Sequence, residues 1–153
     1  MTPAPSLPSA FDEYGQHWTD IRVYYEDTDF TGMVYHANYL RFFERGRSNH
    51  LRDAGISHTS LLERPDPAAF TVTRVEIDFR KPAGVDDLLR IRTRYLGTKG
   101  ARILFSQAAL RDEEILASAN ITAVQIHLDG RPRRPVREAA EILETYIVRS
   151  EDN

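Results

Sequence analysis

The feature that most constrains the fold of this chain is a change in its hydrophobic period near residue 70. Between about 36 and 54, apolar residues recur at the spacing of an amphipathic helix. Beyond this point apolar and polar residues alternate, in segments that follow one another closely. These segments are 70–80, 87–96, 101–110 and 115–128. Strands at such spacing favour antiparallel pairing, which predicts an α+β layer with the long helix against one face of a sheet.

Weaker signals extend this pattern toward both ends. Residues 18–25 are rich in β-branched and aromatic side chains and predict a first strand. Gly55 would end the long helix in the C′ position, and Pro135 suits the first turn of a last helix over 135–148. The predicted sheet therefore has about five strands, and its exposed edges would need cover, which favours a dimer.

Length and composition predict one ordinary globular domain. The chain has 153 residues, and we expect the domain over 17–148. The prolines of residues 1–16 predict a flexible lead-in, and 149–153 a polar tail. The net charge of −3 provides no basic field for nucleic acid, and no apolar run approaches the ~20 residues of a membrane span. The N-terminus lacks the pattern of a signal peptide, so a cytoplasmic protein is expected.

The predicted long helix has a broad apolar arc. The arc contains Tyr39, Leu40, Phe42, Phe43, Gly46, Leu51 and Ala54. Arg47 and His50 also fall within it, and we expect His50 to be a core or interface histidine with satisfied hydrogen bonds. His36 and His50 cannot share a metal ion, because the helix between them spans about 21 Å. The absence of cysteine removes thiolate catalysis and Cys-based zinc sites, so no metal is expected.

Chemistry is most strongly suggested by the stretch YYEDTDFTGMVYHANYLRFFERGR, residues 24–47. Asp27 and Asp29 stand in a loop shortly before the predicted helix, and Gly32 lets the chain turn sharply. Acids in such loops are most often turn formers that bind nearby backbone amides. A helix start, however, offers unpaired N–H groups and a partial positive charge that would polarise a carbonyl. An acid beside it could act as a base or a nucleophile in acyl transfer.

The same stretch resembles the signature of the hotdog-fold thioesterases, and most closely the bacterial acyl-CoA thioesterases of the YbgC type, with the 4-hydroxybenzoyl-CoA thioesterases as near relatives. The pattern T/C-D-x-x-G-x-V-aromatic-x-x-N-Y is matched by Thr28, Asp29, Gly32, Val34, Tyr35, Asn38 and Tyr39. The resemblance extends more weakly over about 20–135. It implies a long helix wrapped by an antiparallel sheet, and a dimer with a continuous sheet and a site at each subunit boundary.

The resemblance also implies roles for individual residues. Asp29 would be the catalytic carboxylate, and the backbone N–H of His36 would bind the thioester carbonyl. The His36 side chain, which favours the YbgC type, would assist proton transfer or orient Asp29. The motif residues Gly32, Val34 and Tyr35 would lie around the substrate. No separate cofactor is implied, because coenzyme A is part of the substrate.

Basic residues enter this expectation because coenzyme A carries phosphates, which arginine binds bidentately. In the family, the turn before the fourth strand and the region after the last strand contribute nucleotide contacts. These regions correspond to Lys99 and Arg102, and to Arg133 and Arg134. Such charges are about as often solvated surface. Glu44, at the edge of the apolar arc, predicts either an exposed acid paired with a helix neighbour or an orienting partner for the site.

Two functions of different classes agree with these observations. The first is hydrolysis of a short-chain or aromatic acyl-CoA thioester to free acid and CoA, with residues 56–70 helping to shape the acyl pocket. The second is a non-hydrolytic hotdog module that binds acyl-CoA or acyl carrier protein in a cell-envelope assembly. The intact acid, glycine and helix start favour the enzyme. A hotdog dehydratase is a weaker third interpretation, because its histidine and acid follow a different pattern.

Overall fold

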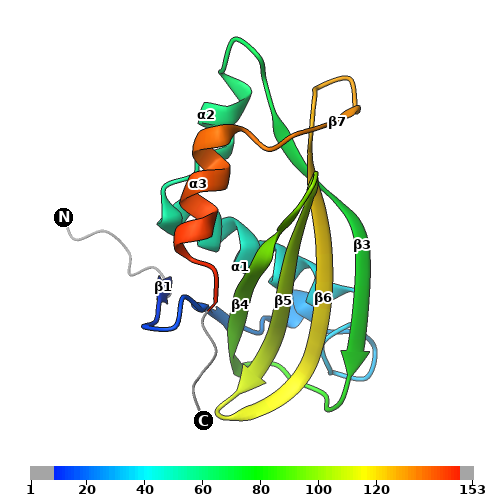
Figure 1. Cartoon of the computed structure of the whole chain (residues 1–153). Helices are drawn as coiled ribbons and strands as arrows, with labels where there is room; N and C mark the ends of the chain where they lie inside the picture. Colours follow the sequence, from blue (N-terminus) through cyan, green and yellow to red (C-terminus); the bar gives the residue numbers. More distant parts are fainter. Residues whose placement is uncertain (1–8, 149–153) are drawn as a thin grey trace, which may run out of the picture.

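The structure is a computed structural model that describes residues 9–148, in which one antiparallel sheet curves around a long helix (Figure 1). The strand order is β1-β2-β4-β5-β6-β3, and β7 pairs with β6. The strands are β1 (Ser9–Phe11), β2 (His17–Arg22), β3 (Ala69–Phe79), β4 (Leu88–Lys99), β5 (Arg102–Arg111), β6 (Glu114–Ile126) and β7 (Pro132–Arg133). The helices are the 3-10 turn η1 (Tyr25–Asp27), α1 (Asn38–Ala54), α2 (His58–Leu62) and α3 (Arg137–Thr145).

This order confirms the predicted α+β architecture and the hotdog arrangement. The five predicted strands correspond to β2 through β6, and the two predicted helices to α1 and α3. Gly55 caps α1 with a φ of 98°, a left-handed conformation that costs glycine little because it has no Cβ. The short elements β1, β7 and α2 are absent from the sequence prediction, because two to five residues are too few to establish a period.

The predicted domain boundary at residue 17 is too late. Ser9–Phe11 pairs with β2, and the Phe11 ring stacks on Tyr146 with centroids 3.9 Å apart. The Asp12 carboxylate then accepts hydrogen bonds from the side chains of Gln16 and Trp18. Residues 9–16 therefore belong to the folded domain and not to a lead-in. Residues 1–8 and the predicted polar tail at 149–153 lie outside the described residues.

The apolar arc of α1 packs against the sheet, with one exception. Tyr39, Phe42, Phe43 and Leu51 are buried as predicted. Leu40, from the same arc, is 43% exposed. Together with residues of α1 and β3 it lines an open hollow of about 500 Å³. Within one chain, this side of the helix has no cover.

Gly46 is where α1 comes closest to the sheet. A Cβ placed on Gly46 would lie 2.8 Å from Ile91 Cγ2, 2.8 Å from Thr93 Oγ1 and 3.0 Å from Gln107 Nε2. Real Cβ atoms do not approach neighbours this closely, so β4 and β5 would have to move. The glycine therefore permits a helix–sheet distance that no other residue allows.

Substituting Gly46 with alanine is expected to lower the free energy of unfolding by about 1–2 kcal/mol. Overpacking costs about 1–3 kcal/mol, and the better helix propensity of alanine returns up to about 1 kcal/mol. Urea unfolding would measure the difference, with the exposed Arg52→Ala on the same helix as a control expected within about 0.5 kcal/mol of wild type. A Gly46→Ala protein as stable as wild type would show that β4 and β5 move aside at no cost.

His50 is buried as expected, but its hydrogen bonds are not satisfied. Its ring is fully buried and lies edge-on to the rings of Phe11 and Phe105, with His17 tilted against it. Neither ring nitrogen has a hydrogen-bond partner among the described residues. Burial makes the largest contribution to lowering the pKa of His50, which falls to about 3. The ring is therefore held neutral by its apolar surroundings.

The sheet has one long open edge. β3 pairs with β6 along one side only, and the exposed apolar side chains Val72, Val75 and Phe79 lie on it. Long exposed edges of this kind favour pairing with another strand.

No helix in the described part of the chain is long and apolar enough to cross a membrane.

Candidate functional site

The two aspartates of the loop have different surroundings. The Asp27 side chain is buried, and its two oxygens accept hydrogen bonds from the Tyr24 amide at 2.8 Å and from Asn38 Nδ2 at 2.7 Å. Its backbone carbonyl also accepts from the Tyr35 amide. Asp27 therefore ties the loop to the first turn of α1, which is the structural role that turn statistics favour.

Asp29 is exposed, and within residues 9–148 only one of its oxygens accepts hydrogen bonds from another residue. Oδ1 accepts hydrogen bonds from the Thr31 amide at 2.8 Å and from Thr31 Oγ1 at 2.6 Å. No group in the described part of the chain donates to Oδ2. The Thr31 hydroxyl, followed by its amide, lowers the pKa of Asp29 below 3.8. The carboxylate is therefore ionised at neutral pH and offers a free oxygen to a reactant.

Gly32 shapes the turn that presents this carboxylate. Its φ is 82°, and its amide donates to the Asp29 carbonyl at 3.1 Å. The Asp29 amide in turn donates to the Met33 carbonyl, which closes the loop. Gly32 thus acts through its backbone conformation.

The start of α1 lies directly after this loop. Asn38, Tyr39 and Leu40 donate their amides to carbonyls one turn back. The amides of His36 and Ala37 donate to no group within the described residues, and no side chain caps the helix. These two N–H groups, together with the positive end of the helix dipole, suit a developing oxyanion.

The predicted site residues are brought together in part. Asp29 and Tyr35 line one hollow of about 430 Å³ with Arg41 and Ala37. The His36 ring packs between Tyr35 and Phe79, with centroids at 4.7 and 6.1 Å, and makes no hydrogen bond to Asp29. Val34 is different, because it is buried in the core and 7% exposed. Within this chain Val34 packs into the core under the loop and does not line the hollow that contains Asp29.

A network that the sequence did not reveal holds the loop in place. Met33 bridges to Gly84, and the Val34 amide donates to the Ala83 carbonyl at 2.8 Å. The Gly84 amide donates to Asp87 Oδ2, and this bond is the main cause that lowers the pKa of Asp87. Arg111 binds the same oxygen at 2.9 Å. These contacts join segments far apart in sequence, so no local motif could have identified them.

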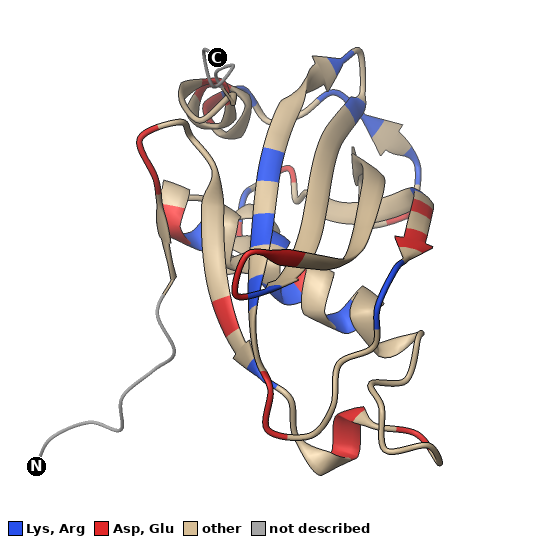
Figure 2. Cartoon of the chain, turned by 90° about the horizontal axis from the view of Figure 1, so that it is seen from below, with Lys and Arg blue, Asp and Glu red and all other residues tan. Residues whose placement is uncertain are grey.

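The predicted phosphate-binding residues lie at the opposite end of the sheet. The Asp29 loop contacts the chain just before β4, whereas Lys99 ends β4 and pairs with Arg102 across the hairpin. The length of β4 separates the two regions by up to about 36 Å. In Figure 2 the red turn of η1 lies at the bottom of the view, and basic residues colour β4 up to its far end at the top. One chain therefore does not bring Asp29 and these cations together.

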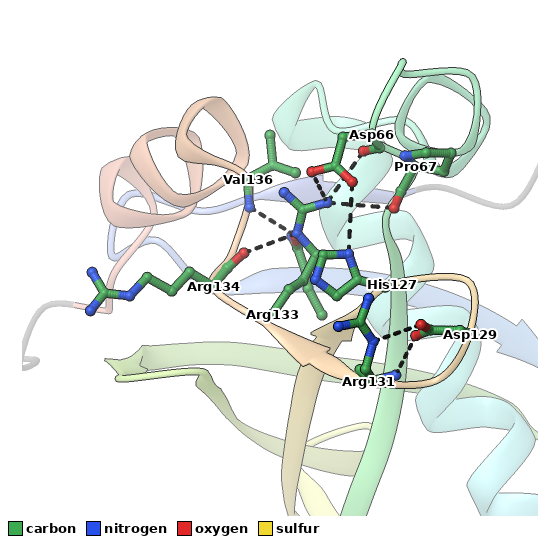
Figure 3. Close-up of polar contacts among 9 residues, drawn as sticks. Asp66, Pro67, His127, Asp129, Arg131, Arg133, Arg134 and Val136 are labelled. Atoms are coloured by element: carbon green, nitrogen blue, oxygen red, sulfur yellow. Dashed lines mark hydrogen bonds and ion pairs between the residues drawn. The ribbon is translucent and has the colours of Figure 1, made fainter.

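Arg133 is engaged within the protein. Its guanidinium pairs with Asp66 Oδ2 at 2.9 Å and donates to the carbonyls of Asp66 and Pro67. His127 approaches the same carboxylate at 3.7 Å. Figure 3 shows this cluster, with the Arg134 side chain pointing away from it. Arg133 thus attaches β7 to the loop before β3, while Arg134, Lys99 and Arg102 remain exposed.

Glu44 takes the structural role that was expected on helix spacing. Its Oε1 accepts a hydrogen bond from Ser48 Oγ at 2.5 Å, one turn further along α1. Among the described residues, no group of three or more His, Asp or Glu side chains could hold a metal ion.

Known proteins with similar sequences show the family to which this chain belongs. The family model of the thioesterase-like superfamily matches residues 23–145. The acyl-CoA thioesterase YbgC of Haemophilus influenzae is 44% identical over 108 residues, which cover 71% of this chain and 79% of that protein. The acyl-CoA thioester hydrolase YbgC of Escherichia coli is 38% identical over 115 residues, covering 74% and 84%.

A solved structure agrees with these sequence relatives. The crystal structure of a probable thioesterase from Bartonella henselae superposes with a TM-score of 0.77 at 44% identity. The superposition covers 79% of this chain and 99% of the Bartonella henselae chain. The matched region includes the loop of Asp29, the start of α1 and the whole sheet from β3 to β6. The chain therefore belongs to the thioesterase-like superfamily, as a YbgC-type thioester hydrolase with the hotdog fold.

Proposed function

We propose that this protein hydrolyses short-chain or aromatic acyl-CoA thioesters to the free acid and CoA. The observation that carries the proposal is the ionised Asp29, which shares a hollow with Ala37 at the start of α1. Within the described residues, Oδ2 of Asp29 accepts no hydrogen bond, and the amides of His36 and Ala37 donate none. A carbonyl oxygen bound by these amides would be polarised, while its carbon faced the carboxylate. Thiolate is a good leaving group, so this modest arrangement is sufficient.

Two routes lead from this arrangement to the same products. Asp29 either attacks the carbonyl carbon, expelling CoA thiolate and forming an anhydride that water cleaves, or it removes a proton from an attacking water. Each route consumes one water and yields one acid and one thiol. Single-turnover hydrolysis in ¹⁸O-water tests the first route, because label enters the Asp29 carboxylate only when water cleaves an anhydride at the Asp29 carbonyl carbon. Neither route uses a cofactor.

The proposed site is completed by a second copy of the chain. If β3 pairs antiparallel with β3 of another subunit, the sheet continues across the interface. The Lys99 end of one subunit's sheet then lies on the same side as the Asp29 end of the other subunit's sheet. The exposed Lys99, Arg102 and Arg134 of one subunit then come toward the Asp29 end of the other, where CoA phosphates need cations. The exposed apolar residues of β3 and Leu40 support this pairing, because a partner would cover them.

Substituting Val75 with lysine is expected to yield a monomer and to lower kcat/KM for acyl-CoA by more than about 10-fold. Val75 is 37% exposed in one chain and tolerates a lysine there, but a charge buried against a partner strand costs several kcal/mol. Light scattering measures the mass, and Leu128→Lys, at a 62% exposed site in the turn after β6, is the matched control. A Val75→Lys protein with the wild-type mass and activity would contradict pairing through β3.

Thiol release from a panel of thioesters tests the proposed function directly. The panel contains acetyl-, butyryl-, hexanoyl-, palmitoyl-, benzoyl- and 4-hydroxybenzoyl-CoA, with one acyl carrier protein thioester. We expect turnover on the short or aromatic members, in keeping with a cytoplasmic enzyme that meets CoA esters. CoA binding without turnover on any member would instead support the non-hydrolytic module, which the free carboxylate at the helix start does not favour.

A further inference from the structure

A small pocket with a cationic wall lies further along α1 from the Asp29 loop. Its volume is about 140 Å³. Its apolar lining is Leu51, Phe70, Val72, Phe105 and Ala123. Arg47 and Glu44 line both this pocket and the open hollow next to it, and Arg41 connects that hollow with the one at Asp29. The three hollows therefore follow one side of α1.

Arg47 is held rigidly in the wall of this pocket. Its Nη1 donates to Gln107 Oε1 at 2.9 Å. Gln107 is itself fixed, because its Nε2 donates to the Phe43 carbonyl at 2.8 Å and to Thr93 Oγ1 at 2.9 Å. Arg47 forms no ion pair within the described part of the chain, and none of its nitrogens is buried without a partner. Its other N–H groups are therefore accessible from the two hollows that Arg47 lines.

We propose that this pocket receives the far end of the acyl group and that Arg47 selects acyl groups bearing a hydroxyl there, an inference that rests on the function proposed above. An apolar cavity of about 150 Å³ takes up benzene, so the pocket suits one ring or a few carbons. Arginine donates and never accepts hydrogen bonds, so its partner on the substrate is an oxygen acceptor. Glu44 on the same wall repels a carboxylate but can accept a hydrogen bond from a hydroxyl group.

The proposed dimer places this pocket next to the reacting carboxylate. Antiparallel pairing of β3 makes the two α1 helices run in opposite directions on the same face of the joined sheet. The start of one α1 then lies beside the second half of the other, where Ser48 and Leu51 line the pocket. The acyl pocket of one subunit thus faces the partner subunit's Asp29, and Arg47 contacts the part of the substrate remote from the thioester.

Paired substrates test this assignment. We would measure kcat/KM for benzoyl-CoA and 4-hydroxybenzoyl-CoA with wild type, Arg47→Met and Arg47→Lys. Wild type should prefer the hydroxylated substrate by about 10-fold or more, the value of a hydrogen bond to a charged group. Arg47→Met keeps the apolar stem, so kcat/KM for 4-hydroxybenzoyl-CoA should fall by about 10-fold more than kcat/KM for benzoyl-CoA, which erases the preference. Arg47→Lys, which keeps a donor, should retain part of it.

Other outcomes would overturn the assignment. An equal loss on both substrates would show that Arg47 only supports the fold, and Tm values for both variants would reveal that role. A monomeric mass for Arg47→Met with an unchanged preference would show that Arg47 pairs with a partner carboxylate. Hydrolysis by wild type without any preference for the hydroxylated substrate would contradict the role of Arg47 but not the proposed thioesterase function. Absence of hydrolysis on every thioester removes the proposed function together with it.

Discussion

Replacing Asp29 with asparagine is expected to lower kcat for acyl-CoA hydrolysis by about 10²- to 10⁴-fold, the contribution typical of a positioned acid–base group. Asparagine has the same shape and can still accept the hydrogen bonds of Thr31, but it is neither a base nor a nucleophile. Because Asp29 is exposed, Tm should not change. Thiol release and circular dichroism would measure the two effects separately.

Two further aspartates make this experiment specific. Asp112→Asn changes an exposed residue in the turn between β5 and β6 and should leave both kcat and Tm at their wild-type values. Asp27→Asn should lower Tm, because the Asp27 carboxylate accepts from the Tyr24 amide and from Asn38. Full turnover by Asp29→Asn would mean that another acid performs the chemistry, and Asp27 and Glu44 would be the next candidates.

Lowering the pH from 7 to 5 is expected to destabilise the fold by about 2 kcal/mol through His50 alone. Burial lowers the pKa of folded His50 from 6.5 to about 3. Below pH 6.5 His50 binds a proton in the unfolded chain, whereas in the folded protein it stays neutral until the pH falls to near 3. The stabilisation is therefore fully present above pH 6.5 and decreases by about 1.4 kcal/mol per pH unit below it. Between pH 6.5 and 5 this amounts to about 2 kcal/mol.

Urea unfolding at both pH values, with wild type and His50→Phe, would measure this effect. Phenylalanine suits the surrounding rings and cannot titrate, so the variant should lose about 2 kcal/mol less between pH 7 and 5. The charged and titratable groups around His50 are His17, Asp53 and Tyr146, and they remain in both proteins. The exposed His58→Phe should behave as wild type. Identical losses for wild type and His50→Phe would mean that water or a rearrangement accommodates the charged ring.

The parts of the fold that could be predicted are those with local periodicity. The helix of α1 and the alternation in β4 and β5 are visible in the sequence because burial selects apolar residues at the helix and strand periods. Leu40 shows the limit of that argument. It belongs to the apolar arc by spacing, yet it is exposed because the sheet does not reach that side of α1.

The candidate site could be predicted where one short segment carries it. Asp29, Gly32 and the start of α1 lie within a few residues of each other, so their proximity follows from chain connectivity. Loop position alone could not separate the roles of Asp27 and Asp29, since both are loop acids before a helix, whereas the family motif implied that Asp29 is the catalytic acid. Burial separates them, because Asp27 binds the helix side chain Asn38 while Oδ2 of Asp29 stays free.

By itself, the sequence determined the order of the long elements and the acid beside a helix start, since both depend on neighbours along the chain, and its resemblance to the hotdog thioesterases implied the architecture. Only the tertiary structure decided which groups meet over long separations. It placed Lys99 and Arg102 at the end of the sheet away from Asp29, and it engaged Arg133 with Asp66. It also surrounded His50 with aromatic rings, where no group in residues 9–148 hydrogen-bonds to it. The physical reason is that strand pairing and side-chain packing join segments whose separation in sequence carries no information about their distance in space.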